Sequence, residues 1–188
     1  MKKHLIIILT LIFNLTGCSH HESANEIRVG TIAGPETELM QVAKKVALQR
    51  FGLKVTITHF NDYVLPNRAL HDGDIDANAF QHLAYLKAQN KAQGYRLVSA
   101  GKTFLYPMGV YSNKITSLKA LKAGDKIALP NDPSNETRAL LLLQQAKLIQ
   151  LKSGQTELTP EDITSNPKQL KWVTLDAANL PGELPDVT

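Results

Sequence analysis

The chain has 188 residues, a formal net charge of +4, 43% hydrophobic residues and a single cysteine. One cysteine excludes a framework of disulfide bonds within the chain. The basic residues are scattered rather than clustered, so the composition does not indicate nucleic-acid binding.

The first segment in chain order has the pattern of a targeting sequence. Residues 1–17 combine basic Lys2 and Lys3, an apolar run of eleven residues and a small residue before Cys18. This pattern predicts a secretory signal peptide, and the apolar run is too short to span a membrane. The stretch Leu-Thr-Gly-Cys is similar to a bacterial lipobox, which predicts that Cys18 is lipidated and becomes the new N-terminus.

The mature chain is expected to begin with a tether. Residues 18–26 are mostly polar and show no periodicity, which indicates a flexible connection between the lipid and the fold. Cleavage before Cys18 removes two of the 21 basic residues, so the formal charge falls from +4 to +2. The remaining length suits one sizeable core or two small lobes.

Strands and helices alternate in the predicted elements that follow. The sequence predicts strands at 27–32, 55–60, 75–79 and 95–100, and helices at 35–51, 66–71 and 82–93. Pro35 suits the first turn of its helix, Glu36 suits the positive end of the helix dipole, and Gly52 stops the helix. This alternation implies βαβ units and a mainly parallel sheet, so the fold class is α/β.

The second half continues the alternation after an interruption. Pro107 and Gly109 break a predicted strand at 104–111, which favours an edge or a crossing point, and we expect the hinge there. Beyond it the sequence predicts a short helix near 118–121, a strand at 126–129, a helix carrying 139–143, a turn-rich excursion at 148–166, a strand at 170–175, and at most one helical turn at 179–184.

Residues 61–86 hold the first candidate site. Tyr63, Phe80, His82 and Tyr85 are concentrated around a Gly-Asp-Ile-Asp-Ala-Asn turn. Strand and turn would therefore deliver aromatic and imidazole groups to one edge of the fold, as in the lining of a small-ligand pocket. Residues alone leave both a structural and a functional role open for His82.

A metal site is not indicated. No second ligand follows His82 at helical spacing, and zinc needs three or four ligands. The remaining mature-chain histidines show no ligand spacing: His20, His21, His59 and His71. We therefore expect neither a metal ion nor another cofactor.

The second candidate site is the predicted helix start at residues 131–143. A helix N-terminus presents unpaired N–H groups, and Arg138 lies one turn inside, where it can add a two-pronged contact to a carboxylate. Together these features describe a site for an amino-acid carboxylate. Taken alone, Arg138 would be read as a surface arginine of a helix.

Catalytic motifs are absent. The Gly-Lys-Thr of residues 101–103 lacks the earlier glycine of a phosphate loop, because Arg96 stands there. The chain also lacks the nucleophile-elbow and zinc-protease motifs, so the sequence predicts a protein that is not an enzyme.

Three blocks, at 30–39, 61–85 and 129–143, resemble in order and spacing the NlpA lipoprotein family, the methionine-binding lipoproteins of bacterial ABC importers. The resemblance covers nearly all of the mature chain. It implies that an aromatic and imidazole set lines the methionine pocket and that a polar pair binds the ligand's polar groups. These residues are Tyr63, Phe80, His82 and Tyr85 for the first set, and Asn135 and Arg138 for the second.

The resemblance also implies a two-lobed periplasmic-binding-protein-like fold of type II. We expect lobe 1 at 27–106 and the hinge with lobe 2 at 107–188. The expected function is capture of L- or D-methionine, or a closely related amino acid, for an ABC permease and its ATPase. The expected location is the cell envelope, with a lipid anchor in the membrane and the fold facing the periplasm or the cell exterior.

The chain departs from the family pattern at two places. Family members usually have glycine where this chain has Thr137, which predicts a narrower approach to the ligand. Members also continue past the position that matches Thr188, which predicts a fold that is incomplete at the C-terminus. Two alternatives to import follow: a truncated or decayed paralogue that is anchored without transporting, and an interaction lipoprotein that uses the lobes as a scaffold.

Overall fold

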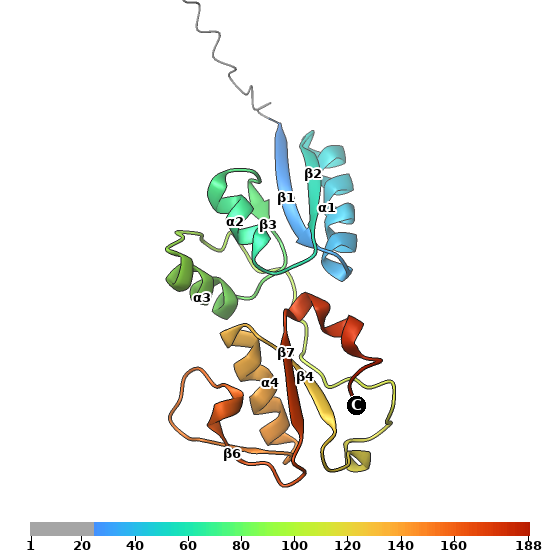
Figure 1. Cartoon of the computed structure of the whole chain (residues 1–188). Helices are drawn as coiled ribbons and strands as arrows, with labels where there is room; N and C mark the ends of the chain where they lie inside the picture. The colour runs from blue at the N-terminus through green and yellow to red at the C-terminus, as the bar shows by residue number, and fades with distance from the viewer. Residues whose placement is uncertain (1–24) are drawn as a thin grey trace, which may run out of the picture.

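The computed structural model describes residues 25–188 as two groups of elements (Figure 1). The predicted signal peptide at 1–17, the predicted lipidation site Cys18 and most of the predicted tether at 18–26 lie outside the described residues. The first group holds the elements up to residue 93, and the second group holds those from residue 118 onward.

A three-stranded parallel sheet organises the first group. Its strands are β1 (Glu26–Ile32), β2 (Lys54–Phe60) and β3 (Ala77–Asn78), in the order β2-β1-β3. The register pairs Val29 with Ile57 on one side and with Ala77 on the other. The predicted parallel pairing is confirmed, although β3 is shorter than the predicted strand at 75–79.

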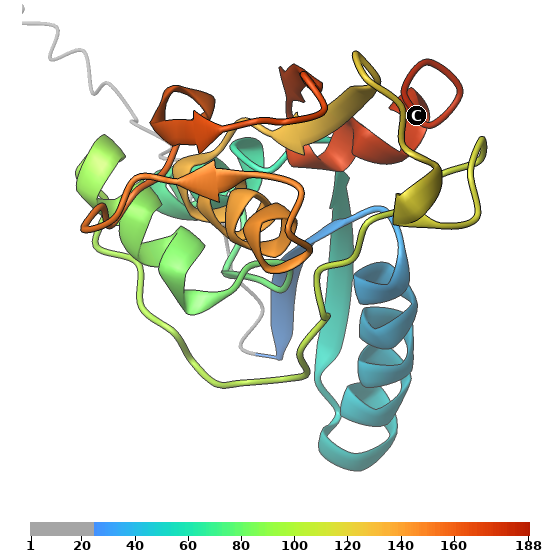
Figure 2. The same ribbon diagram turned by 90° about the horizontal axis from the view of Figure 1, so that it is seen from below.

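Three helices accompany this sheet: α1 (Pro35–Phe51), α2 (Leu65–Asp72) and α3 (Leu83–Gln93). Each ends at a glycine in the left-handed conformation, namely Gly52, Gly73 and Gly94, a conformation that glycine adopts without steric cost. Figure 2 shows α1 running alongside β2. Across residues 25–188, no helix combines the length and the apolar character that crossing a membrane requires.

Gly30 is required by close packing inside the first sheet. A Cβ atom at this position would lie 2.7 Å from Ile75 Cδ1 and 2.8 Å from a ring carbon of Phe60. Both distances are shorter than real Cβ contacts, so any larger residue would displace these side chains.

The second group is built on a parallel pair of strands. Its elements are β4 (Lys126–Pro130), α4 (Pro133–Gln145), β5 (Gln150–Leu151), β6 (Ile163–Ser165), β7 (Lys171–Leu175) and three short 3₁₀ helices, η1 (Leu118–Ala120), η2 (Pro160–Asp162) and η3 (Ala177–Glu183). β4 pairs with β7 in parallel, and β5 pairs with β6 antiparallel. The predicted excursion at 148–166 therefore contains a small sheet of its own.

The main hydrophobic core lies in the second group. α4 contributes Leu140 and Leu143, which are 0% and 2% exposed, and β4 contributes Leu129 at 2%. Leu148, which follows α4, and Leu170, which precedes β7, belong to the same core cluster. The helical spacing of the α4 leucines thus turns one face of the helix onto the parallel strands.

Two strand predictions were wrong. Residues 94–117 contain neither helix nor strand, whereas strands had been predicted at 95–100 and 104–111. A strand needs a neighbour to accept and donate its backbone hydrogen bonds, and no strand of residues 25–188 pairs with this segment. The segment leaves Val98 84% and Leu105 81% exposed, and it connects the two groups of elements.

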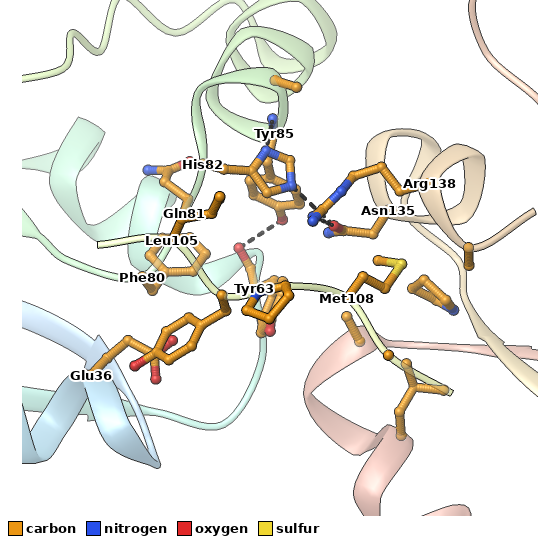
Figure 3. Close-up of a pocket in the computed structure, with 18 of the residues that line it drawn as sticks. Glu36, Tyr63, Phe80, Gln81, His82, Tyr85, Leu105, Met108, Asn135 and Arg138 are labelled. Carbon is orange, nitrogen blue, oxygen red and sulfur yellow. Dashed lines mark hydrogen bonds between the residues drawn. The ribbon is translucent and has the colours of Figure 1, made fainter. Parts of the chain in front are cut away.

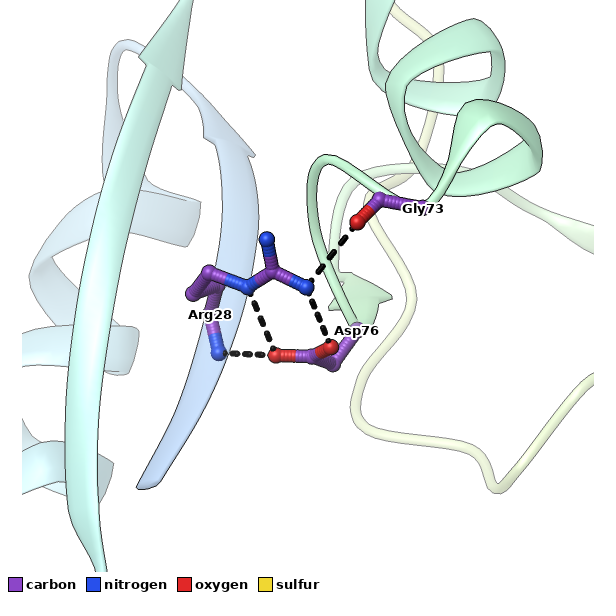
Figure 4. A network of polar contacts seen from close by, with 3 residues as sticks. All are labelled: Arg28, Gly73 and Asp76. Carbon is purple, nitrogen blue, oxygen red and sulfur yellow. Dashed lines mark hydrogen bonds and ion pairs between the residues drawn. The ribbon is translucent and has the colours of Figure 1, made fainter. Parts of the chain in front are cut away.

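An ion pair between Arg28 and Asp76 fastens β1 to the turn before β3 (Figure 4). Arg28 donates from Nε at 3.1 Å and from Nη2 at 2.8 Å to the two carboxylate oxygens, and its backbone N–H donates at 2.6 Å. Nη2 also donates to the Gly73 carbonyl oxygen at 2.9 Å. The hydrogen bonds from the Arg28 guanidinium hold the pKa of Asp76 below its ordinary value.

The packing of the core predicts that two adjacent leucines contribute differently to the free energy of unfolding. Leu140→Ala is expected to lower the free energy of unfolding by about 2–5 kcal/mol, because it leaves a cavity in a fully buried position. Leu141→Ala is the matched control, since Leu141 is 45% exposed. Urea unfolding followed by circular dichroism measures both, and equal losses would contradict this description of the core.

The Arg28–Asp76 pair predicts a pH dependence of stability. A lowered pKa in the folded state means that the stabilisation is present above the ordinary value of 3.8 and is lost as pH falls through the folded-state pKa. Asp76→Asn should therefore lower the thermal midpoint at pH 7 and flatten its decline on acidification. Asp72→Asn is the control, because Asp72 forms an exposed pair with Arg68 at 3.6 Å. Indistinguishable pH profiles for wild type and Asp76→Asn would contradict the expectation.

Candidate functional site

A cleft of about 2300 Å³ is lined by both groups of elements (Figure 3). Pockets for small ligands usually measure roughly 300–1,000 Å³, so a small ligand would fill only part of this space. All six predicted ligand-binding residues line it: Tyr63, Phe80, His82, Tyr85, Asn135 and Arg138. The structure therefore brings the two sequence-predicted sites together.

Three aromatic rings form an edge-to-face cluster on the first side of the cleft. The ring centroids of Tyr63 and Phe80 are 5.6 Å apart, and each lies 5.9 Å from the ring of Tyr85. The Tyr85 hydroxyl donates to the Tyr63 carbonyl oxygen at 2.8 Å. Because edge-to-face rings hold one another in place, the cluster presents a fixed apolar wall.

Local structure explains why these rings meet. Tyr63 follows β2 in a turn that Asp62 closes by accepting the N–H groups of Val64 and Leu65 at 2.7 and 2.8 Å. Phe80 follows β3, and Tyr85 lies in the first turn of α3. The rings thus gather where parallel strands end, as ligand sites do in open α/β sheets.

His82 joins the aromatic side of the cleft to the opposite side. It caps α3, since its Nδ1 accepts the backbone N–H of Tyr85 at 3.1 Å, and its Nε2 lies 3.0 Å from Asn135 Oδ1. An amide oxygen only accepts, so Nε2 carries the proton and the ring is the Nε2–H tautomer. His82 therefore has a structural role as a cap and a place in the cleft at the same time.

The opposite side of the cleft is the first turn of α4. Asp132 caps this helix by accepting the Asn135 N–H at 2.9 Å, and Pro133 occupies the first helical position. Arg138 follows one turn later and donates from Nη1 to Asn135 Oδ1 at 2.9 Å. A guanidinium and a side-chain amide are thus placed beside each other at the cleft surface.

Burial changes the pKa of three groups near the cleft. It raises the pKa of the Tyr63 and Tyr85 hydroxyls above 10.0, and the nearby Asp132 carboxylate adds to both shifts. Both phenols are therefore neutral hydrogen-bonding groups at physiological pH. Burial also raises the pKa of Glu136, which is 8% exposed on α4, with smaller contributions from Glu161 and Asp132.

A buried amide network lies behind the aromatic side, and sequence reasoning missed it. Asn67 is 0% exposed and exchanges hydrogen bonds with Gln81, donating at 2.9 Å and accepting at 2.6 Å. Asn78 donates to the same Asn67 oxygen at 2.9 Å. The network fixes the segment that carries Phe80 and His82. Its only signal in the sequence is a set of amide residues around the predicted turn. Which of these amides form hydrogen bonds with one another depends on the tertiary fold.

Thr137 faces away from the cleft, contrary to expectation. Its Oγ1 accepts the N–H of Leu158 at 2.8 Å, and the residue is not among those that line the cleft. Thr137 thus fastens the excursion between α4 and β7 to the helix. The predicted narrowing of the ligand approach by Thr137 is wrong, because the side chain points to the other face of α4.

The titratable groups of the cleft do not indicate a metal centre. Among residues 25–188, no group of three or more histidine, cysteine, aspartate or glutamate side chains is arranged to hold a metal ion. The arrangement at the cleft is instead an apolar wall facing an arginine and an amide. Chemically, this suits reversible binding of a small molecule with an apolar end and an anionic end.

The chain is similar to known proteins. The profile of the NlpA lipoprotein family matches residues 27–188. The D-methionine-binding lipoprotein MetQ of Salmonella typhi is 55% identical over 174 residues, which cover 92% of this chain and 64% of that protein.

The chain is also similar to solved structures of binding proteins. A nutrient-binding protein from Burkholderia cenocepacia bound to methionine has 56% identity and a TM-score of 0.82, with 86% of this chain and 68% of that chain covered. A periplasmic substrate-binding protein of an ABC transporter from Coxiella burnetii has 65% identity and a TM-score of 0.81, with the same coverage.

These comparisons confirm the predicted α/β, two-lobed periplasmic-binding-protein-like fold. The names of these relatives describe binding proteins, in agreement with the prediction that the chain is not an enzyme. The chain spans about 64% of the length of the curated relatives it matches.

Proposed function

Because the chain belongs to the NlpA lipoprotein family, we propose that it captures methionine, in the L or D form, or a closely related amino acid. The observation that carries the proposal is the cleft itself. Two sites predicted from separate parts of the sequence line one cavity, an aromatic wall on one side and Arg138 with Asn135 on the other. Such a cavity matches a ligand with an apolar side chain and a carboxylate.

The aromatic side is the proposed site for the ligand's side chain. Tyr63, Phe80 and Tyr85 present ring edges and faces within one cluster. A thioether sulfur makes favourable contacts with aromatic ring edges, typically about 0.3–1.5 kcal/mol each. The unbranched methionine side chain therefore fits this wall better than a polar side chain would.

The helix side is the proposed site for the ligand's polar groups. Arg138 donates from Nη1 to Asn135, and its remaining guanidinium N–H groups are suited to a two-pronged contact with a carboxylate. His82 and Asn135 add polar groups at the boundary between the two sides. In this proposal one ligand contacts both sides of the cleft at once.

We also propose a role for the two lobes in transport. With lobe 1 at 27–106 and lobe 2 at 107–188, a ligand that contacts both lobes favours the closed state in proportion to its differential affinity. The closed, loaded protein would deliver its ligand to an ABC permease and its ATPase. Lipidation of Cys18 would hold the protein at the membrane, on the periplasmic or outer side of the cell envelope.

Calorimetric titration of the full chain in detergent with L-methionine and D-methionine tests the proposal. We expect saturable binding of at least one enantiomer. Arg138→Ala should weaken it by roughly tenfold or more, since a hydrogen bond to a charged group contributes about 1.5–3 kcal/mol. Phe80→Ala should weaken it by a similar factor, because burying a side chain such as Phe contributes about 1.5–3 kcal/mol. Matched controls are Phe51→Ala and Arg68→Ala, because both residues are exposed outside the cleft.

The outcome that contradicts the proposed function is absence of binding of either enantiomer to a chain that circular dichroism shows to be folded. Unchanged binding in Phe80→Ala and Arg138→Ala would instead contradict the site assignment while leaving the function in place.

A further inference from the structure

The Asp132 carboxylate accepts hydrogen bonds from three groups in the first turn of α4. Its Oδ1 accepts the backbone N–H of Asn135 at 2.9 Å and the Ser134 hydroxyl at 2.7 Å. Asp132 itself does not line the cleft. Its carboxylate is therefore placed to act on the site through a neighbouring side chain rather than on a ligand directly.

That neighbouring side chain is the amide of Asn135. Its Nδ2 donates to Oδ1 and Oδ2 of Asp132 at 3.1 and 2.9 Å. A carboxylate only accepts hydrogen bonds, so it fixes which end of the amide faces it. With the nitrogen held against Asp132, the amide oxygen must point to the opposite side.

The amide oxygen of Asn135 then receives one donor from each side of the cleft. Arg138 Nη1 donates at 2.9 Å from within α4, and His82 Nε2 donates at 3.0 Å from the cap of α3 (Figure 3). His82 cannot reverse its roles, because its Nδ1 already accepts the Tyr85 N–H. A single oxygen atom therefore bridges the two groups of elements.

We propose that Asp132 is a positioning residue, which locks the Asn135 amide in the one orientation that joins His82 to Arg138. The bridge consists entirely of protein groups, so it favours the same closed arrangement of the two lobes that a ligand contacting both lobes favours. It also directs the Arg138 guanidinium toward Asn135. The Asp132 carboxylate thus prepares the cleft in advance, which lowers the ordering cost of binding.

Asp132→Asn separates this role from helix capping. Asparagine caps helices about as well as aspartate, so the Asn135 N–H keeps an acceptor. However, the new side-chain NH₂ faces the Nδ2 donor of Asn135. The Asn135 amide can turn over to avoid this contact between two donors. Its Nδ2 donor then faces the donors of Arg138 and His82. The turned-over arrangement breaks the bridge while the cap of α4 remains, because the Asn135 oxygen then faces the new NH₂ group instead of Arg138 and His82.

The imidazole N–H signals of the full chain, labelled with ¹⁵N-histidine and free of ligand, report the bridge directly. We expect a His82 Nε2–H signal in the wild type, assigned by its loss in His82→Asn. Asp132→Asn should lose the signal through exchange with water. Asp125→Asn should keep it, because Asp125 accepts the Lys122 N–H at 2.8 Å in the same lobe without lining the cleft.

A second variant keeps the test decisive if Asp132→Asn does not fold. Asp132→Ser retains an oxygen that can cap α4 but offers no carboxylate to hold Nδ2, so it should also lose the signal. Persistence of the wild-type His82 signal in a folded variant of either kind would overturn the positioning role.

A methionine titration adds a second readout, and this arm alone rests on the proposed function. Asp132→Asn should weaken binding about tenfold, the effect of one hydrogen bond to a charged group, while Asp125→Asn should match the wild type. If the wild type binds no methionine but the His82 signal still depends on Asp132, the proposed function falls and the positioning role stands. Wild-type affinity in Asp132→Asn would overturn the claim that the bridge prepares the cleft for binding.

Discussion

The hydrogen bond between His82 Nε2 and Asn135 Oδ1 is the contact on which the candidate site depends. At 3.0 Å it joins the cap of α3 to the first turn of α4, across 53 residues of sequence. Each of the two residues has a polar support: Gln81, which precedes His82, belongs to the Asn67 amide network, and the Asp132 carboxylate accepts from the Asn135 amide. This contact directly joins the support of the apolar wall to that of the cationic group, and both line one cavity.

Local sequence signals predicted most elements of the fold. The helix Pro35–Phe51 and its stop at Gly52 follow from residue types whose backbone preferences act within one turn. The strands predicted at 95–100 and 104–111 failed because apolar residues in a row indicate burial, whereas a strand also needs a hydrogen-bonding neighbour. That neighbour is a property of the whole fold and leaves no mark in the segment itself.

The candidate site was also predicted only in part from local sequence signals. Two residues that line the cleft were identifiable for different reasons. Phe80 lies in a cluster of aromatic residues, and Arg138 lies one turn inside a predicted helix start and matches the family pattern. The residues that orient them were missed. The sequence predicted no role for Asp132, Asn67 or Gln81, since their partners are set by the fold. Thr137 was misjudged because its position next to Arg138 says nothing of which face of α4 it occupies.

In the proposed function, one ligand lies between the aromatic wall and Arg138, with its sulfur at the rings. A crystal of the protein grown with free selenomethionine tests this most directly, because anomalous scattering locates the selenium atom. We expect a single strong peak in van der Waals contact with the rings of Tyr63, Phe80 and Tyr85, and carboxylate density at the Arg138 guanidinium. A selenium peak elsewhere would contradict this placement of the ligand. So would the absence of a peak when the protein was crystallised at a ligand concentration that calorimetry shows to be saturating.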